Sequence, residues 1–470
     1  MKQSRILLAV CCMILLGMLL SCKKDSFSTL PTDTLRYSAD TIRFDTVFTS
    51  VGSVTKSFKI FNDHDQKIHI STIKLMGGNS AAFSMNVNGQ TTHEFKDFVL
   101  EANDSMYVFV SVHINPNSLN VPFVVSDSIL ISYNGNEQYV QLQAYGQNAH
   151  FIRNQIIAGN QTWINDLPYV IEGNLHIDTT AHLQIEAGCL LYIHANGQII
   201  VDGQLTAIGN ANNTIQFKGD RLDAPYRNMP GSWPGIYFRN ESHDNQLIFV
   251  NIQNAQEAVK LEGSSVSNTP KLFIQQSIID NASIAGIIGV ESTLSANNTL
   301  ISNCGKNISV SLGGNYDFTN CTFSSYSTLY ALHEHPVAEL SNYLSNNGSV
   351  VVSDLTAQFT NCIFWGDGGT VEDEILLLKQ GNQLFNVTLE NCLYKATADP
   401  TPANIVASIK NIDPLFDSID PGNHYFDFHF KHTATSPLMD AGTHTNFLYD
   451  LDDLTRETGP STDIGCYEKQ

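Results

Sequence analysis

The chain has 470 residues, 42% of them hydrophobic and 10% aromatic, so it is long enough for two or three domains and too apolar to be disordered. Only 15% of the residues are charged, and the formal net charge is −21. Such an acidic surface repels phosphate groups, which excludes nucleic acid as a partner and disfavours binding to anionic polysaccharides.

Residues 1–21 are predicted to be a lipoprotein signal peptide. Two basic residues, Lys2 and Arg5, precede an apolar run at residues 6–20 that is too short to span a membrane comfortably. The letters "LLSC" at residues 19–22 resemble the lipobox of bacterial lipoproteins. This resemblance implies that Cys22 becomes the lipidated first residue of the mature protein. The alternative is an ordinary signal peptide followed by an incidental cysteine.

Residues 22–39 are predicted to be a tether between the lipid and the folded chain. Their opening letters, "CKKDSF", resemble the export tag of surface lipoproteins in Bacteroidetes. The resemblance implies a protein anchored in the outer membrane and exposed at the cell surface. No second apolar stretch of membrane-spanning length occurs in the sequence, so we expect the remainder to be tethered rather than spanning.

Residues 40–148 are predicted to form a β-sandwich. Short segments such as "KSFKIFN" and "KIHISTIKL" alternate apolar and polar residues and are separated by turn-rich stretches, a pattern that favours antiparallel strands. The letters "DTVFTSVGSVTKSFKIFN" resemble the opening of Ig-like domains shared by cilia-associated and bacterial anchor proteins. The resemblance implies a spacer or a contact with another envelope protein.

The middle of the chain contains a repeat. The letters "FTNC" occur at residues 318–321 and again at 359–362, and six segments share one pattern of two apolar residues in alternation followed by an amide. Most neighbouring amides are 22 to 25 residues apart, and insertions account for the longer steps. This period, with alternation inside each unit, predicts a solenoid of short strands. The six ladder amides are Asn251, Gln276, Asn298, Asn320, Asn361 and Asn391.

An amide at one position of every coil has a structural purpose. Asparagine tolerates the left-handed backbone of a tight bend, and stacked amides can hydrogen-bond along the column. Three of the amides are followed directly by a cysteine. Because a free cysteine packs like a small hydrophobic residue, we predict packing there, with disulfides as the alternative. The cysteines outside the leader and Cys22 are Cys189, Cys304, Cys321, Cys362, Cys392 and Cys466, and none forms the closely spaced pair that zinc needs.

Residues 160–470 resemble the right-handed parallel β-helix proteins of the pectate-lyase-like superfamily. The resemblance rests on the glycine-punctuated residues 169–209, on "GSWPGIYF" at 231–238, and on "DPLF", "SPLMDAG", "DLDD" and "DIGCYE" in order near the end. It implies an all-β fold in which the sandwich is followed by the β-helix and a C-terminal cap. It also implies a rigid groove of the kind that binds or cleaves polysaccharides, although a fold alone does not determine function.

Polysaccharides are cleaved by lyases or by hydrolases, and each kind of cleavage needs its own residues. A lyase needs a base, and the loop region around residues 218–239 offers Arg221, Arg227 and Arg239 as candidates, with a solvated basic rim as the alternative. A hydrolase needs two carboxylates at related positions of neighbouring coils. Asp280 lies four residues after Gln276, but the same position of the following coils holds Ser302, Ser324, Trp365 and Lys395. No carboxylate column is therefore predicted.

Two groups in the insertions offer metal ligands. His333 and His335 are two residues apart and would share one face of a strand, and "VEDEI" at 371–375 offers carboxylates for calcium. Polar exposed loops are the alternative for both groups. The insertions also carry four aromatic residues, which either stack on sugars or cover the core. They are Tyr326, Tyr330, Tyr343 and Trp365.

The sequence therefore predicts a lipid-anchored lipoprotein that carries a sandwich and a β-helix. Missing catalytic columns favour a non-catalytic module that binds a glycan or another envelope component. A polysaccharide lyase or glycoside hydrolase of unrecognised type is one alternative. A structural or adhesive surface protein is the other. No cofactor is predicted, apart from the calcium contact considered above.

Overall fold

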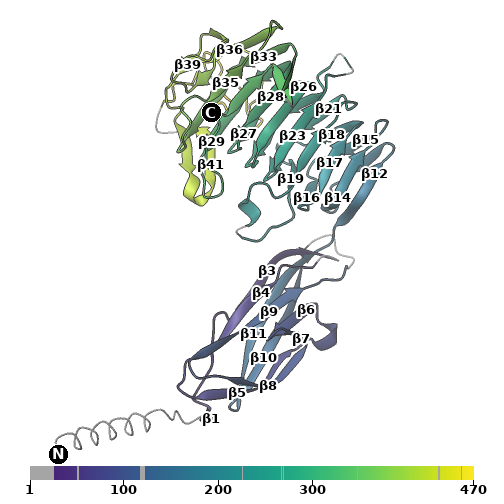
Figure 1. Cartoon of the computed structure of the whole chain (residues 1–470), viewed down its shortest axis with the longest axis vertical. Coiled ribbons are helices and arrows are strands. Elements are labelled where there is room, and N and C mark those ends of the chain that lie inside the picture. Colours follow the sequence, from purple (N-terminus) through teal and green to yellow (C-terminus); the bar gives the residue numbers. More distant parts are fainter. Residues whose placement is uncertain are drawn as a thin grey trace, which may run out of the picture. The chain divides into compact units, whose positions relative to one another are not determined.

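A computed structural model describes residues 26–49, 52–116, 122–224, 226–265, 267, 269–346, 348–431, 435–456 and 458–470. Cys22 and the leader lie outside the described residues. The described residues form 41 strands and three single-turn 3-10 helices, which confirms the all-β prediction. The chain divides into two compact units between Asn148 and Ala149 (Figure 1).

The first unit is a sandwich of two sheets. One sheet has the strand order β1 (Phe27–Ser28), β5 (Lys67–Leu75), β10 (Phe123–Tyr133), β11 (Asn136–Gln147) and β3 (Thr41–Phe48), with β8 (Glu94–Leu100) also paired to β5. The other has the order β2 (Arg36–Tyr37), β4 (Lys56–Asn62), β9 (Asp104–Val112), β6 (Phe83–Val87) and β7 (Gln90–Thr91). A single-turn helix, η1 (Gly78–Ser80), lies between β5 and β6.

The alternating residues of these strands build the sandwich core. Phe44, Phe58, Phe83 and Val108 are all buried in one cluster. The prediction of antiparallel strands for residues 40–148 is wrong for one pair, because β3 pairs with β11 in parallel. β1, which lies in the predicted tether, also pairs in parallel, with β5. Alternation shows which side of a strand is buried but not its direction, so this difference could not be seen in the sequence. The likeness to Ig-like domains stays a prediction.

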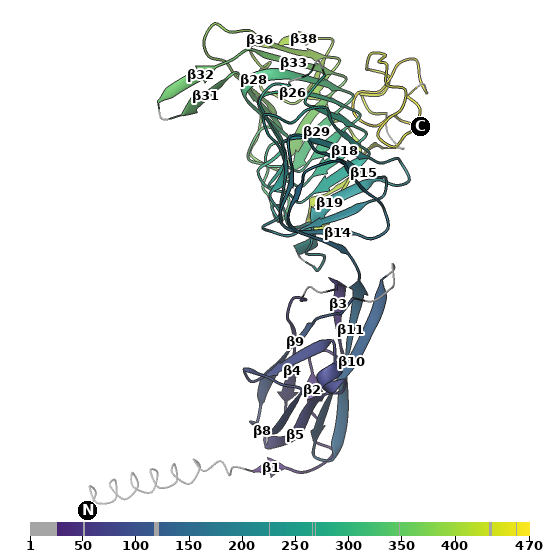
Figure 2. The same cartoon turned by 90° about the vertical axis from the view of Figure 1, so that its right-hand side faces the viewer.

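The second unit is a parallel β-helix, as predicted. Its 26-stranded sheet closes into coils, and each coil of the central region contributes one strand segment to each of three parallel stacks, named here face A, face B and face C. Figures 1 and 2 show the stacked coils from two directions. The first strand begins at His150, before the predicted boundary at 160. The direction in which the coils wind stays a prediction.

Face A contains β12 (His150–Ile157), β14 (Tyr169–Ile177), β17 (Gln198–Val201), β20 (Gly235–Phe238), β23 (Glu257–Glu262), the first halves of β26 (Ala285–Asn297) and β28 (Ile308–Thr319), β30 (Ala338–Ser341) and β35 (Ile375–Leu378). Face B contains β13 (Gln161–Trp163), β15 (His182–Ile185), β18 (Gln204–Ile208), β21 (Asn245–Ile248), β24 (Leu272–Gln275), the second halves of β26 and β28, β33 (Leu355–Thr360), β36 (Phe385–Glu390) and β38 (Asn404–Val406).

Face C begins with the first halves of β12 and β14. It continues through β16 (Leu190–Ile193), β19 (Ile215–Gly219), β22 (Val250–Gln253), β25 (Ile278–Asp280), β27 (Leu300–Ser302), β29 (Thr322–Tyr326), β34 (Ile363–Asp367), β37 (Leu393–Tyr394) and β39 (Ile409–Lys410). A separate antiparallel hairpin, β31 (Tyr343–Asn346) and β32 (Ser349–Val352), projects from the coils in Figure 2.

The repeated "FTNC" letters form neighbouring rungs of the β-helix. Phe318 stacks on Phe359 with ring centroids 5.1 Å apart, and β28 pairs with β33 at these two residues. The cysteines that follow, Cys321 and Cys362, are buried in the same core. All six described cysteines are buried free thiols, so packing is confirmed and the disulfide alternative is wrong.

Five of the six ladder amides occupy the same bend between faces B and C, which we call the amide bend. Each has a positive φ, between 44° and 54°, in the left-handed region that asparagine tolerates. The five are Gln276, Asn298, Asn320, Asn361 and Asn391. The prediction was wrong for Asn251. It lies inside β22 opposite Ile278, and Phe249, with φ of 50°, occupies that bend instead. A two-residue shift preserves the alternation of the strand, so the pattern could not distinguish the two positions.

The described residues of 411–470, named here the C-terminal segment, run along the side of the β-helix. A cap on the end of the last coil stays a prediction. Its apolar residues Leu438, Leu451 and Ile464 are buried against outward-facing residues of face C such as Leu300 and Ile363. The outward apolar residues of a coil cannot be buried by the coil itself, so a separate segment of the chain covers them.

The amide bends also hold the C-terminal segment. The Asn361 amide donates to Asn320 Oδ1 (2.9 Å) and to the Thr443 carbonyl (2.8 Å), and its oxygen accepts from the Thr443 N–H (2.8 Å). The side chain of Asn391 donates to the Ala441 carbonyl (3.2 Å). Gln276 donates to the Asp450 carbonyl at 2.8 Å. The ladder therefore binds a neighbouring segment as well as shaping the bend.

We expect Asn361→Gly to destabilise the protein by about 2–4 kcal/mol, because it removes one buried and two partly buried hydrogen bonds while tolerating the positive φ. Asn361→Ala should cost about 1 kcal/mol more, because alanine is strained in the left-handed region. Urea-induced unfolding measures both losses. The control is Asn386→Ala at an exposed position of β36, with an expected change within about 0.5 kcal/mol. Equal stability of Asn361→Gly and the wild type would contradict the role of the bend.

Candidate functional site

A hairpin of the C-terminal segment rests on face C. It consists of β40 (Phe416–Asp420) and β41 (Tyr425–Phe430), joined by η3 (Pro421–Asn423). Buried aromatic residues of the hairpin pack on the coils, and Phe428 lies 6.3 Å from Tyr326 of β29 between ring centroids. Figure 1 shows β41 beside β27 and β29. The hairpin thereby forms a wall above the open surface of face C.

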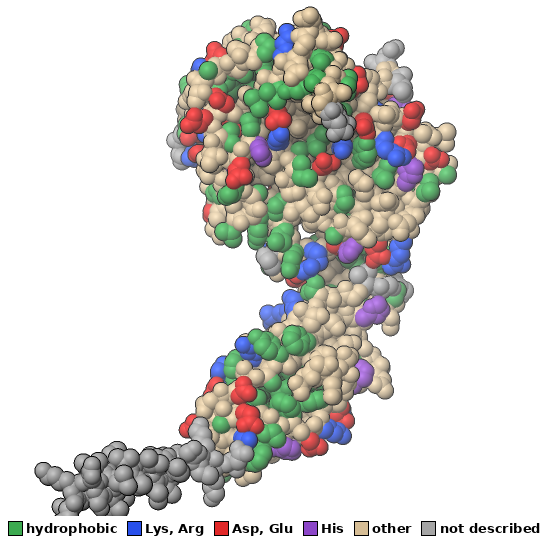
Figure 3. Space-filling model, viewed as in Figure 1, with side chains coloured by type: hydrophobic (Ala, Val, Ile, Leu, Met, Phe, Trp, Pro, Cys, Tyr) green, Lys and Arg blue, Asp and Glu red, His purple; other side chains and the backbone are tan. Residues whose placement is uncertain are grey.

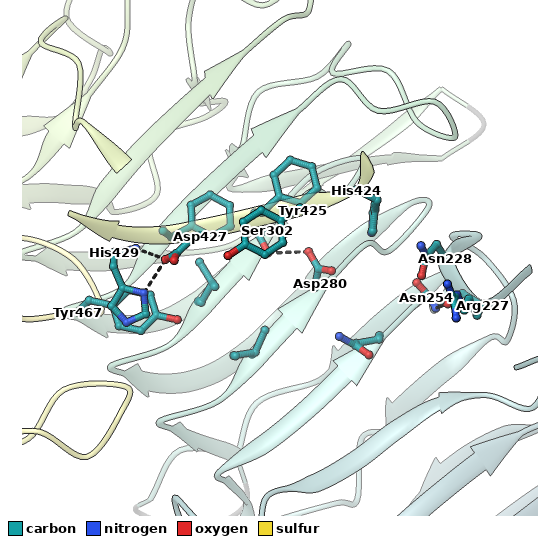
Figure 4. A pocket seen from close by; sticks show the side chains of 15 residues that line it. Arg227, Asn228, Asn254, Asp280, Ser302, His424, Tyr425, Asp427, His429 and Tyr467 are labelled. Carbon is teal, nitrogen blue, oxygen red and sulfur yellow. Dashed lines mark hydrogen bonds and ion pairs between the residues drawn. The ribbon is translucent and has the colours of Figure 1, made fainter. Parts of the chain in front are cut away.

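A cavity of about 500 Å³, named here the hairpin cleft, lies between this wall and the coils. It is the candidate functional site. Figure 4 shows the side chains that line it. They come from η2 (Tyr226–Asn228), from β22, β25 and β27 of face C, from β41 with the residue before it, and from Tyr467. The lining residues are Arg227, Asn228, Gln253, Asn254, Ile278, Asp280, Leu300, Ser302, His424, Tyr425, Phe426, Asp427, Phe428, His429 and Tyr467.

Asp280 is the carboxylate on the floor of the hairpin cleft. It accepts hydrogen bonds from Ser302 Oγ (2.7 Å) and Asn303 Nδ2 (3.1 Å), one coil along. Burial raises the pKa of Asp280, although these two hydrogen bonds lower it. The side chain therefore holds a proton at a higher pH than an ordinary aspartate does.

His429 stands at the end of the cleft between two carboxylates. Its Nδ1 lies 2.6 Å from Asp427 Oδ1, and its Nε2 lies 2.7 Å from Asp452 Oδ2. The bond to Asp452, assisted by Asp427, raises the pKa of His429 to about 9 although burial opposes it. The ring also packs on Tyr467, with centroids 3.9 Å apart. His429 is therefore a cation at neutral pH that ties the hairpin to the loop at Asp452.

The opposite end of the cleft is formed by η2. Asn254 Nδ2 donates to the Arg227 carbonyl (2.8 Å), and Asn281 Nδ2 donates to the Asn228 carbonyl (2.9 Å) and to Asn254 Oδ1 (2.7 Å). These bonds fix the turn to the coils. Figure 4 shows Arg227, Asn228 and Asn254 grouped away from His429 and Tyr467. Arg227 itself is exposed and lines the cleft.

The structure separates the three arginines that the sequence offered as lyase bases. Only Arg227 lines the hairpin cleft. Arg221 pairs with Asp223 at 2.8 and 2.9 Å, and Arg239 follows β20 of face A and pairs with Asp202. Hydrogen bonds to these carboxylates raise the pKa of both guanidinium groups, which makes them poorer bases. Figure 3 likewise shows Lys and Arg side chains interspersed with Asp and Glu on the face in view.

The two histidines offered as metal ligands do not meet. His333 is buried and lies 2.9 Å from Glu374 through Nε2, whereas His335 is exposed. The insertion therefore does not run as the extended strand that would place both on one face. Of the predicted calcium ligands, Glu372 is exposed, and Asp373 accepts from Thr397 N (2.6 Å). Among the described residues, no group of three or more His, Cys, Asp or Glu side chains is placed to hold a metal ion.

Most residues that line the hairpin cleft were not predicted from the sequence. Asp280 was considered for a column, and its predicted partners are correct, since Asp280 pairs with Ser302 and Ser302 with Ser324. The wall residues, including His424 and His429, lie more than a hundred positions away in a region without repeats. The alternation in "YFDFHF" is a signal that could have indicated a strand there.

Comparisons with known proteins do not assign the chain to a family. No protein-family model and no curated protein matches it. A family 123 glycoside hydrolase from Clostridium perfringens is 7% identical over 26% of this chain and 30% of its own, with a TM-score of 0.18. The PapD-like domain 7 of human CEP192 is 10% identical over 27% of this chain and 92% of its own, with a TM-score of 0.17.

A protein of unknown function from Porphyromonas gingivalis W83 is 9% identical over 27% of this chain and 60% of its own, with a TM-score of 0.18. The chain spans less than a third of the length of the glycoside hydrolase. Likenesses of this size carry no argument about function. Among the described residues, none belongs to a helix long and apolar enough to cross a membrane.

The raised pKa of His429 predicts a pH dependence of stability. Its folded-state pKa of about 9 exceeds the ordinary value of about 6.5, so its ion pairs stabilise fully below pH 6.5 and are lost as pH rises through 9. We expect His429→Gln to lower the Tm at pH 6 by no more than about 4 °C, because solvent screens the half-exposed pair. The difference should vanish near pH 10. A thermal melt series checks this, with the exposed His335→Gln as control, and a difference that grows with pH would contradict it.

Proposed function

We propose that the chain is an outer-membrane lipoprotein, anchored through Cys22 and exposed at the cell surface, whose β-helix binds a glycan without cleaving it. The sandwich lies between the anchor and the β-helix in the sequence and serves as a spacer or a contact for another envelope protein. The observation that carries the proposal is the hairpin cleft. Its walls combine aromatic rings with amide, hydroxyl and charged side chains in one hollow.

The lining of the cleft suits a sugar. Tyr425 is 55% exposed, and together with the half-buried Phe426 it offers aromatic surface for the apolar face of a sugar ring. Gln253, Asn254 and Ser302 supply donors and acceptors for hydroxyl groups. The floor consists of paired strands, so little conformational entropy is lost when a ligand binds.

Several features favour binding over cleavage. Of the two carboxylates that line the cleft, Asp427 is engaged by His429 through both the ring and the backbone N–H (3.0 Å). Of the three arginines offered as lyase bases, Arg221 and Arg239 are held by carboxylates and lie outside the cleft lining, which leaves Arg227 alone in it. The cleft thus has groups for recognition, while one of its two carboxylates is already occupied by His429.

We expect the soluble chain that begins at Lys23, without the lipidated cysteine, to bind at least one of a panel of neutral and uronate-containing polysaccharides in isothermal titration calorimetry. Tyr425→Ala should weaken that binding about 3- to 10-fold through loss of ring contact. Tyr139→Ala removes an equally exposed tyrosine from the sandwich, where Tyr139 is 46% exposed, and should leave binding unchanged. Absence of binding across the panel would overturn the proposed function. Equal effects of Tyr425→Ala and Tyr139→Ala would show that the hairpin cleft is not the binding site.

A glycoside hydrolase is the second candidate, and the raised pKa of Asp280 is the observation that favours it. A carboxyl group that keeps its proton at higher pH suits the general acid that protonates a glycosidic oxygen. Asp427 would then have to leave His429 to activate water. This requirement makes hydrolysis the less supported function.

Hydrolysis predicts that the panel polysaccharides gain reducing ends when incubated with the protein. Asp280→Asn should then lower the rate about 100-fold or more, because the asparagine cannot donate the proton. Its control is Ser302→Ala, which removes only a partner of Asp280 and should have a smaller effect. Wild-type protein that binds a glycan without releasing reducing ends would exclude this candidate for that glycan.

A further inference from the structure

Trp365 differs from the other two tryptophans of the chain. Trp163 and Trp233 are buried, with 5% and 0% of their surface exposed, and belong to the β-helix core. Trp365 is half-buried and lies in β34 on the outer side of face C, opposite Ser324 of β29. A tryptophan that packs in the core needs no further explanation, but one that opens onto solvent beside a cavity does.

Two cavities adjoin Trp365, one of about 400 Å³ and the other of about 360 Å³. We name them together the Trp365 groove. The first is lined by Tyr326 and by Phe416 and Ile419 of β40, while the second is lined by Lys395 and Asn411. The groove is separate from the hairpin cleft, because β40 lines the groove and β41 lines the cleft.

Lys395 holds the indole of Trp365 in place. The Lys395 ammonium donates to the Gly366 carbonyl at 2.6 Å and lies 5.6 Å from the centroid of the Trp365 ring. This cation–π contact fixes the ring without filling either cavity. The ring is therefore a rigid platform, and binding to it costs little side-chain entropy.

Carboxylates surround the platform. Asp367, Asp413 and Asp417 line the first cavity with Lys431, and Glu372 lines the second with Lys395. Acids outnumber bases, so an anionic ligand would be repelled. Carboxylate and amide oxygens are good acceptors for hydroxyl groups, and an aromatic platform takes the apolar face of a sugar ring. The combination fits an uncharged sugar and disfavours a uronate.

We propose that the Trp365 groove is a second glycan-binding site that takes uncharged sugars. The inference rests on the proposed function, because both sites then serve the same glycan. Two sites on one face would let a single polymer chain bind with more avidity than a short fragment.

The test uses the soluble chain that begins at Lys23 with four probes: cellohexaose, xylohexaose, mannohexaose and hexagalacturonate. Because both other tryptophans are buried, a change of tryptophan fluorescence reports on Trp365. We expect an uncharged probe to change the emission of the wild type and of Tyr425→Ala. Trp365→Ala should abolish that change and lower the number of bound hexasaccharides measured by calorimetry from two to one. Trp365→Phe keeps a ring and should bind less than 10-fold more weakly than the wild type.

The outcomes separate the two proposals. If no probe and no polysaccharide of the panel binds the wild type, the proposed function fails and the inference fails with it. If a probe binds but neither its stoichiometry nor the emission responds to Trp365→Ala, only the inference is overturned. A fluorescence change with hexagalacturonate alone would also overturn it, because the groove would then prefer an anion. The control Tyr139→Ala should behave as the wild type in both measurements.

Discussion

The bend between faces B and C is the constraint on which the rest of the structure depends. Two residues join the strands there, the first of the two has a positive φ, and an amide side chain occupies that position at five successive coils. The same side chains hydrogen-bond to the C-terminal segment at Thr443, Ala441 and Asp450. A backbone requirement of the coils thus creates the surface that places the hairpin, and the hairpin in turn lines the hairpin cleft and the first cavity of the Trp365 groove.

Much of the fold could be predicted because it is local and repeated. The spacing of Asn298, Asn320 and Asn361 and the alternation around them indicated stacked coils, and the structure pairs these segments as expected. The error at Asn251 marks the limit of this reasoning. A strand pattern with a period of two looks the same when shifted by two residues, and only the backbone angle of Phe249 identifies the bend.

The hairpin cleft could not be predicted from the sequence for a different reason. Its floor belongs to the repeat, but His424, His429 and Tyr467 come from a segment with no period and meet the coils through long-range contacts. The group of basic residues in the sequence was also misleading. Arg221 and Arg239 look like a basic group in the sequence, yet each is neutralised by a nearby carboxylate, Asp223 and Asp202. Residue types indicate which chemistry a chain could perform. The fold determines which of those side chains are engaged by a partner and which are not.

The hairpin cleft is built from two parts of the chain that are far apart in the sequence, the coils and the C-terminal segment. Asp280 belongs to a coil that can stack as soon as its neighbours are made, whereas Tyr467 is added long afterwards and must find the finished coils. The coils keep their own hydrogen bonds whatever lies on face C, so changes in the hairpin would leave the scaffold intact. Variation during evolution can then alter what the surface recognises while the amide bends preserve the place where a new segment docks.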